Sequence, residues 1–156
     1  MARYVALFLT LLVALSSLTN SAEARKRHRH FSGALSRPTV NINISISSQD
    51  MNVIVDGSHY ATWDVSTARA GFWTPRGSWR INRMSRVHYS KQFHNYPLPY
   101  AMFFVGGVAI HATKGEAKLG TAASHGCVRL SLTNAARLYA LVQRYGMKKA
   151  LVTVSY

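Results

Sequence analysis

The chain has 156 residues, with 19 Lys and Arg against 5 Asp and Glu, so its formal net charge is +14. Its single cysteine excludes an internal disulfide, and its size suits one domain with a real core. Such an excess of positive charge indicates an anionic partner, for example an acidic envelope polymer, an anionic lipid surface or nucleic acid.

The first 24 residues predict a signal peptide. Arg3 precedes an apolar run from Val5 to Leu15, and Ala22-Glu23-Ala24 has the small-residue pattern of a cleavage site. The apolar run is shorter than the about 20 residues of an ordinary membrane helix, which disfavours an uncleaved anchor. We therefore expect export to the periplasm or cell envelope, with no transmembrane segment in the mature chain.

Residues 25–38 predict a basic and flexible arm. The run from Arg25 to His30 consists of Arg, Lys and His, a composition typical of a solvated tail. Electrostatic tethering to the envelope is an alternative role for this run. Residues 39–156 are then expected to form a single domain.

Short strands are predicted through most of this domain. Val40 to Ser47 alternates apolar and polar residues, which is the pattern of a half-buried strand. Asp56-Gly57 and Gly106-Gly107 favour hairpin turns, and the stretch Pro97-Leu98-Pro99 predicts a break between strands. Further strands are expected at residues 51–55, 60–65, 78–83, 86–90, 102–105, 108–111 and 151–154.

One α-helix is predicted near residues 131–145. Ser131 can cap its start, apolar residues recur at helical spacing, and Gly146 ends it. Many short strands, one clear helix and no alternation of strands with helices favour a mainly β fold, either a sandwich or a barrel.

The single cysteine, Cys127, lies a few residues before this helix. An unpaired cysteine in an exported protein indicates an intermolecular disulfide or a reactive thiol, and polar neighbours favour the reactive thiol over a buried core residue. Gly126 permits a close backbone approach, so the amides around Gly126 and Cys127 could hold an oxyanion. Arg129 suits a substrate carboxylate, or it is a structural side chain.

A cysteine nucleophile needs a base, and two histidines are well placed for that role. His125 lies two residues before Cys127, on the same face of an extended segment, whereas His111 ends a predicted strand and so has a rigid mount. The remaining candidates lack such a context and are expected at the surface: His59, His88 and His94. Zinc held by Cys127, His125 and His111 is a further alternative, weakened by the absence of a second cysteine.

These segments resemble the catalytic domain of the L,D-transpeptidases, also called the YkuD-like domain. The resemblance runs from about Ile42 to the C-terminus, and its long motif joins His111-Ala112-Thr113 to Ser124-His125-Gly126-Cys127-Val128-Arg129. The family usually has glycine where Ala112 stands. Three large apolar residues near matched segments are expected in the core rather than at a ligand: Trp73, Tyr100 and Met102.

The resemblance implies a mainly β sandwich with its site in a groove, and a covalent mechanism without metal or organic cofactor. Cys127 would be the nucleophile and His111 the base, with the Ala112 carbonyl orienting the imidazole ring. Arg129 would bind a substrate carboxylate or brace the loop. The supporting and oxyanion positions would be Ser124, His125, Gly126 and Ala112.

The implied reaction is peptidoglycan L,D-transpeptidation. Cys127 would attack the bond between the third stem residue and the terminal D-alanine, and an amine from a second stem or an envelope protein would take the acyl group. Carbapenems would acylate the same thiol. Water as acceptor would make an L,D-carboxypeptidase, and a free D-amino acid would give exchange. A non-catalytic cationic wall-binding module is another alternative, whereas the basic and aromatic pattern of nucleic-acid binding is missing.

Overall fold

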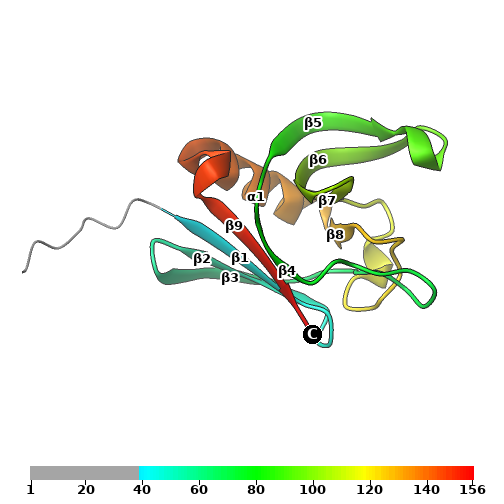
Figure 1. Ribbon diagram of the computed structural model, residues 1–156, viewed down its shortest axis with the longest axis horizontal. Helices are drawn as coiled ribbons and strands as arrows, with labels where there is room; N and C mark the ends of the chain where they lie inside the picture. Colours follow the sequence, from blue (N-terminus) through cyan, green and yellow to red (C-terminus); the bar gives the residue numbers. More distant parts are fainter. Residues whose placement is uncertain (1–38) are drawn as a thin grey trace, which may run out of the picture. The chain divides into compact units, whose positions relative to one another are not determined.

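The computed structural model describes residues 39–156, which form two β-sheets and one long helix (Figure 1). The predicted signal peptide and basic arm lie outside the described residues. The first sheet has the strand order β3-β2-β1-β9-β4, and the second has the order β5-β6-β7-β8. The prediction of a mainly β fold with one main helix is confirmed.

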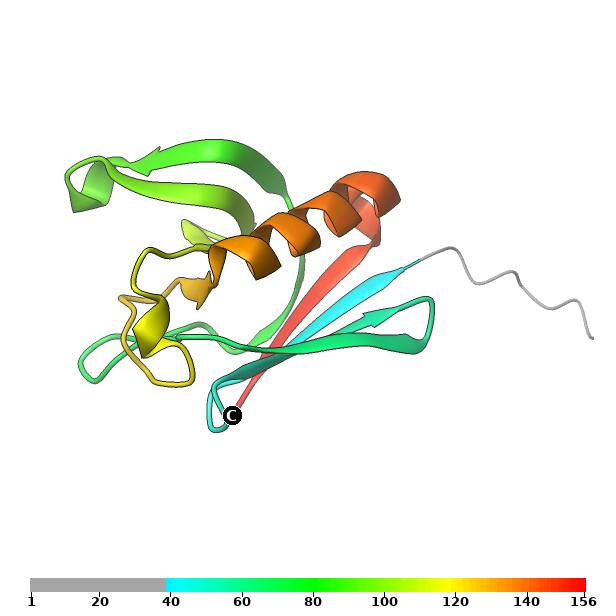
Figure 2. The same ribbon diagram turned by 180° about the vertical axis from the view of Figure 1, so that it is seen from behind.

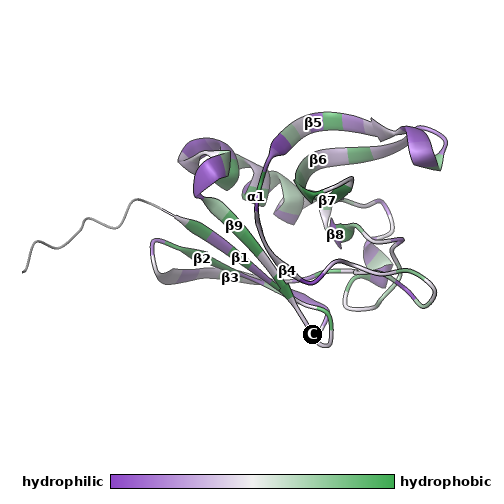
Figure 3. Ribbon diagram, in the orientation of Figure 1, coloured by the Kyte–Doolittle hydropathy of each residue, from purple (hydrophilic) through white to green (hydrophobic). Residues whose placement is uncertain are grey.

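The strands of the first sheet are β1 (Val40–Ser45), β2 (Asp50–Val55), β3 (Ser58–Asp64), β4 (Gly77–Arg80) and β9 (Ala150–Ser155). Its central strand is β1, which pairs antiparallel with β2 and parallel with β9. Val40, Ile42 and Ile44 are buried on one face, as the alternation predicts, because side chains in a strand point alternately to opposite faces. Figure 3 shows the resulting alternation of hydrophobic and hydrophilic residues along these strands.

The second sheet contains β5 (Arg83–Ser90), β6 (Tyr96–Val105), β7 (Val108–Ala112) and β8 (Val128–Leu130). Hairpins join β5 to β6 and β6 to β7, whereas β8 lies parallel to β7. The chain leaves the first sheet just before β5: the Ile81 amide still donates to Ala150, and the Asn82 amide donates to Phe103 of β6. The predicted strand at residues 78–83 is therefore divided between the two sheets.

One prediction about β6 is wrong, because the strand runs through Pro97 and Pro99 without a break. Both prolines pair with β5, opposite Tyr89 and Val87. On its other side, β6 pairs with β7 only from Met102 to Val105. Proline cannot donate a backbone hydrogen bond, and it is tolerated here because that edge of the strand has no partner alongside it.

The helix α1 (Leu132–Tyr145) packs across both sheets (Figure 2). The Ser131 hydroxyl accepts a hydrogen bond from the Asn134 amide at 3.2 Å, which is the expected N-cap. At the other end Gly146 has a φ of +93°, and its amide donates to the Val142 carbonyl. Among residues 39–156, no helix is long and apolar enough to cross a membrane.

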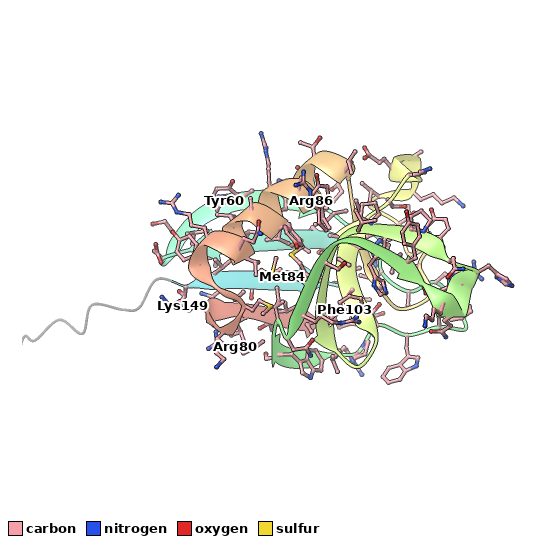
Figure 4. The ribbon with its side chains drawn as sticks, turned by 90° about the horizontal axis from the view of Figure 1, so that it is seen from above. Tyr60, Arg80, Met84, Arg86, Phe103 and Lys149 are labelled. Atoms are coloured by element: carbon pink, nitrogen blue, oxygen red, sulfur yellow. The ribbon has the colours of Figure 1, made fainter. Side chains whose placement is uncertain are left out.

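Short 3₁₀ turns complete the fold: η1 (Lys91–Phe93) joins β5 to β6, η2 (Glu116–Lys118) follows β7, and η3 (Met147–Lys149) leads into β9. Figure 4 shows Arg80 and Lys149 at the same end of the described domain, near the C-terminal end of the helix. Arg80 pairs with Leu151 of β9, two positions after Lys149, so both residues lie near the start of β9.

Candidate active site

The parallel pairing of β7 with β8 brings together the two ends of the long motif. Ile110 pairs with Val128, and both are fully buried in the core. His111 directly follows Ile110, and Cys127 directly precedes Val128, so alternation turns both side chains to the opposite face of the sheet. There they line a single cavity of about 590 Å³. Arg129 pairs with His111 and lines the same cavity.

His111 is held as a neutral imidazole. Its side chain is only 3% exposed, and its Nδ1 lies 2.7 Å from the carbonyl oxygen of Ala112. A carbonyl only accepts, so Nδ1 carries the hydrogen and Nε2 keeps its lone pair. Burial lowers the pKa of His111 from 6.5 to about 4, helped by the charges of Arg129 and His88 and opposed by the Ala112 carbonyl. The ring can therefore accept a proton at neutral pH.

Cys127 is half-buried, with its sulfur against a small apolar cluster that includes Phe103 and Ala109. Burial raises the pKa of its thiol, although a backbone hydrogen bond from Ala109 and the charge of Arg129 act in the opposite direction. Both pKa directions favour the neutral forms, so in the free protein a neutral thiol and a neutral imidazole line the same cavity. The polar sequence neighbours of Cys127 favour a reactive thiol, ionised near neutral pH. The structure instead packs Cys127 against apolar side chains from β6 and β7, and such an environment disfavours the thiolate.

Ser124 fixes the turn that presents Cys127. Its hydroxyl donates to the Cys127 carbonyl at 2.6 Å and accepts from the Gly126 amide at 3.0 Å. The side chain is buried, and these two bonds close the turn on itself. The Gly126 amide thus has a partner in this structure, which favours the Cys127 amide among the two predicted oxyanion donors.

Gly126 is required at its position for two reasons. Its φ is +133°, a conformation that residues with a side chain rarely adopt. A Cβ built on it would also lie 3.2 Å from the carbonyl oxygen of Trp73. The loop containing Trp73 therefore packs directly on the backbone next to the candidate nucleophile.

Thr74 is a supporting residue to which the sequence analysis gave no role. Its buried hydroxyl donates to the Gly126 carbonyl at 2.9 Å and accepts from the Ala68 amide at 3.0 Å. It thus ties the cysteine loop to a segment more than 50 positions earlier in the chain. The residues Thr74-Pro75-Arg76-Gly77 favour a turn, which does not reveal this partner.

Arg129 braces the same loop, since its Nη1 donates to the Ala123 carbonyl at 3.1 Å. Its backbone exchanges hydrogen bonds with Ser66 in both directions. The guanidinium still lines the cavity, so the two predicted roles, structural brace and carboxylate ligand, are compatible in this geometry.

His125 lies at the rim of the cavity between two aromatic rings. The ring centroid of Phe72 is 4.5 Å away in an edge-on arrangement, and that of Phe93 is 5.2 Å away. Partial burial, with Arg69 and Arg129 nearby, lowers the pKa of His125. His125 thus joins the cysteine loop to the tip of the β5–β6 hairpin.

Two predictions about pocket residues are wrong. His88 was expected at the surface without a role, but it lines the cavity, packs edge-on against Phe103 at 5.0 Å and contributes to the low pKa of His111. Trp73 was expected in the core, but it is 76% exposed at the cavity rim. Met102 is buried and Tyr100 packs against the core, as expected. His88 faces the cavity because β5 pairs with β6, and the residues around His88 in the sequence do not show this pairing.

The cavity wall contains Lys118, Arg129 and the three histidines His88, His111 and His125 but no carboxylate. Within residues 39–156, no three His, Cys, Asp or Glu side chains are grouped to hold a metal ion. A ligand with carboxylate groups matches the charge of this wall.

Comparison with known proteins agrees with this arrangement. The family model of the L,D-transpeptidase catalytic domain, YkuD, matches residues 39–154. A comparison with curated proteins gives no match.

Solved structures similar to this chain include three L,D-transpeptidases. The structure from Stackebrandtia nassauensis is 27% identical with a TM-score of 0.66, over 76% of this chain and 56% of that one. One from Mycobacterium smegmatis is 24% identical with a TM-score of 0.67, over 76% and 59%. L,D-transpeptidase 3 from Mycobacterium tuberculosis, in complex with a faropenem-derived adduct, is 22% identical with a TM-score of 0.68, over 76% and 61%.

This chain therefore spans less than two thirds of the length of each of these structures. The match to the family model covers most of the chain and includes both ends of the motif, from His111 to Arg129. The chain belongs to the L,D-transpeptidase catalytic domain family.

Proposed function

We propose that the protein is a cysteine-dependent peptidoglycan L,D-transpeptidase, with Cys127 as nucleophile and His111 as general base. The observation that carries this proposal is the shared cavity, into which adjacent parallel strands turn a thiol and an imidazole with a free Nε2 lone pair. Membership of the L,D-transpeptidase family supports the reaction class.

Acylation begins with the neutral pair. The Cys127 sulfur attacks the carbonyl carbon between the third stem residue and the terminal D-alanine while the thiol proton moves to His111 Nε2. The Cys127 amide donates to the oxyanion that forms. The imidazolium then returns its proton to the D-alanine nitrogen, the C–N bond breaks, and a thioester remains.

This order follows from the two pKa directions. A thiol whose pKa is raised by burial ionises little in the free protein, so proton transfer accompanies the attack. His111 has a pKa of about 4, so its Nε2 is unprotonated over the whole neutral range and the ring is in the form that a general base requires. The hydrogen bond from Nδ1 to Ala112 keeps the ring in the tautomer that the transfer requires.

Deacylation reverses these roles. An acceptor amine attacks the thioester carbonyl, His111 removes a proton from the amine, and the Cys127 thiol leaves with a proton from the imidazolium. A second stem as acceptor gives a cross-link between two third residues. The amine of an envelope protein anchors that protein to the wall, and water gives the carboxypeptidase reaction.

The charge of the cavity fits the proposed donor. The stem peptide carries a carboxylate at its terminal D-alanine and another on its third residue, and the wall offers Lys118 and Arg129 with no opposing acid. The overall charge of +14 suits the anionic wall polymer in the same way. A similar L,D-transpeptidase structure in complex with imipenem, a carbapenem, supports the proposal that carbapenem-type compounds also acylate Cys127.

The test is D-alanine release from a tetrapeptide stem by the purified protein, with the products identified by mass spectrometry. The wild type should release D-alanine and form a cross-linked dimer, and Cys127→Ala should do neither. His59→Gln, at an exposed histidine of β3, serves as the matched control for His111→Gln. If the protein were a wall-binding module without catalysis, the wild type would release no D-alanine, and Cys127→Ala would bind the wall as well as the wild type does.

A further inference from the structure

A second, smaller hollow of about 270 Å³ lies beside the cavity that holds Cys127. Trp73 lines both hollows and so forms the ridge between them. The smaller hollow is lined by three exposed aromatic rings: Phe72 is 44% exposed, Trp73 is 76% exposed and Tyr156 is 78% exposed. Large rings exposed side by side are unusual on a soluble surface and mark a contact site.

Phe72 and Trp73 are held firmly to the active-site loop. The Trp73 carbonyl packs against Gly126, and the next residue, Thr74, donates a hydrogen bond to the Gly126 carbonyl. The Phe72 ring lies edge-on to His125, with the guanidinium of Arg69 4.9 Å from its centroid. These contacts fix the backbone of Trp73 and the ring of Phe72 beside the cysteine loop.

One charged group of the smaller hollow complements these rings. Its lining includes the guanidinium of Arg76 and no acidic side chain, whereas the hydroxyls of Thr67 and Thr74 are buried and already hydrogen-bonded within the protein. A pyranose ring has an apolar C–H face that stacks on an aromatic ring, and hydroxyl and acetamido groups at its edges that hydrogen-bond. Exposed rings beside a guanidinium therefore match an N-acetylated sugar better than they match a second acidic peptide.

We propose that this hollow binds a sugar of the glycan strand that carries the donor stem, with Trp73 as the stacking platform. This inference rests on the proposed function, because it takes Cys127 to hold the third residue of a stem peptide. The first, second and third stem residues together span the distance from the acylated carbonyl to the sugar, and an extended peptide of three residues spans about 10 Å. Because Trp73 touches the residue next to Cys127, a sugar at that distance can reach the ridge and the hollow behind it.

The experiment compares kcat/KM for D-alanine release from two donors, a disaccharide-tetrapeptide and the same tetrapeptide without sugar. For the wild type we expect a preference of about tenfold for the disaccharide donor, the size of one stacked ring contact. Trp73→Ala should reduce this ratio toward one, and Trp73→Phe should keep most of it. The control is Tyr60→Ala, which removes another exposed ring, on β3, and should keep the full ratio.

A binding measurement that needs no turnover separates the two proposals. The chain has three tryptophans, of which Trp63 is only 8% exposed and Trp79 is partly buried, so emission changes at the surface report on Trp73. A peptide-free oligomer of N-acetylglucosamine and N-acetylmuramic acid should shift the emission of the wild type and not that of Trp73→Phe.

The results are distinguishable. Failure to release D-alanine from either donor, together with an emission shift on glycan binding, would refute the transpeptidase proposal and support the sugar site. Equal rates with both donors and no emission shift would overturn the sugar site and leave the reaction standing. A preference that appears only when the sugar is on the acceptor would also overturn it, because the hollow would then serve the second strand.

Discussion

The buried imidazole of His111 predicts a specific loss of stability in mild acid. Its pKa is about 4 in the folded protein, against 6.5 for an ordinary histidine. The unfolded chain therefore binds a proton between pH 6.5 and 4 that the folded protein does not bind. The contribution of His111 to stability is complete above pH 6.5 and is lost as the pH falls through this window.

The magnitude follows from the same two values. A difference of one pKa unit between the folded and unfolded states corresponds to about 1.36 kcal/mol. The full loss of unfolding free energy is therefore about 3 kcal/mol, of which about 2 kcal/mol has occurred at pH 5. A typical domain has a free energy of unfolding of about 5–15 kcal/mol, so the loss is readily measured.

Urea denaturation followed by tryptophan fluorescence at pH 7.5, 6 and 5 gives the free energy of unfolding at each pH. The free energy of unfolding should fall equally with pH in the wild type and in His59→Gln, because both keep His111. In His111→Gln it should fall less steeply over the same range. If His111→Gln and the wild type lost the same free energy between pH 7.5 and 5, the reasoning about the buried neutral ring would be refuted.

Three further predictions concern the reaction and its loop. The acid limb of kcat/KM should fall to half near pH 4, the pKa of His111, and a half-point near 6.5 in steady-state kinetics would contradict the buried base. Iodoacetamide should alkylate Cys127 more slowly than free cysteine at pH 7, because burial raises the pKa of the thiol; a faster rate would indicate a preformed thiolate. Gly126→Ala should cost about 1–3 kcal/mol of unfolding free energy and most of the D-alanine release, because of the φ of +133° and the contact with Trp73. At Gly107 an added Cβ would meet open space, so Gly107→Ala should show no comparable loss of unfolding free energy in urea denaturation.

Features set by local patterns were predictable from the sequence. The alternation from Val40 to Ile44 identified a strand with one buried face, and Ser131 and Gly146 marked the ends of the helix. In both cases the deciding interactions lie within a few residues of each other, so the chain reveals them directly.

Features that depend on pairing between distant segments were not predictable in this way. The prolines of β6 fit because β7 is too short to reach them, which depends on the register of three strands. His88 faces the cavity because β5 pairs with β6, and Thr74 reaches Gly126 across more than 50 positions. The thiol and imidazole were proposed from their motif, but the pKa shifts that favour their neutral forms come from burial in the folded domain, which the motif does not show.

The most direct test of the account is to trap the acyl-enzyme. The protein would be mixed with a disaccharide-tetrapeptide without acceptor, quenched in acid within seconds, digested and analysed by mass spectrometry. The account predicts that the peptide containing Cys127 gains the mass of the donor minus D-alanine, and that Cys127→Ala gains nothing. D-alanine release with no adduct, or an adduct on any other residue, would contradict it.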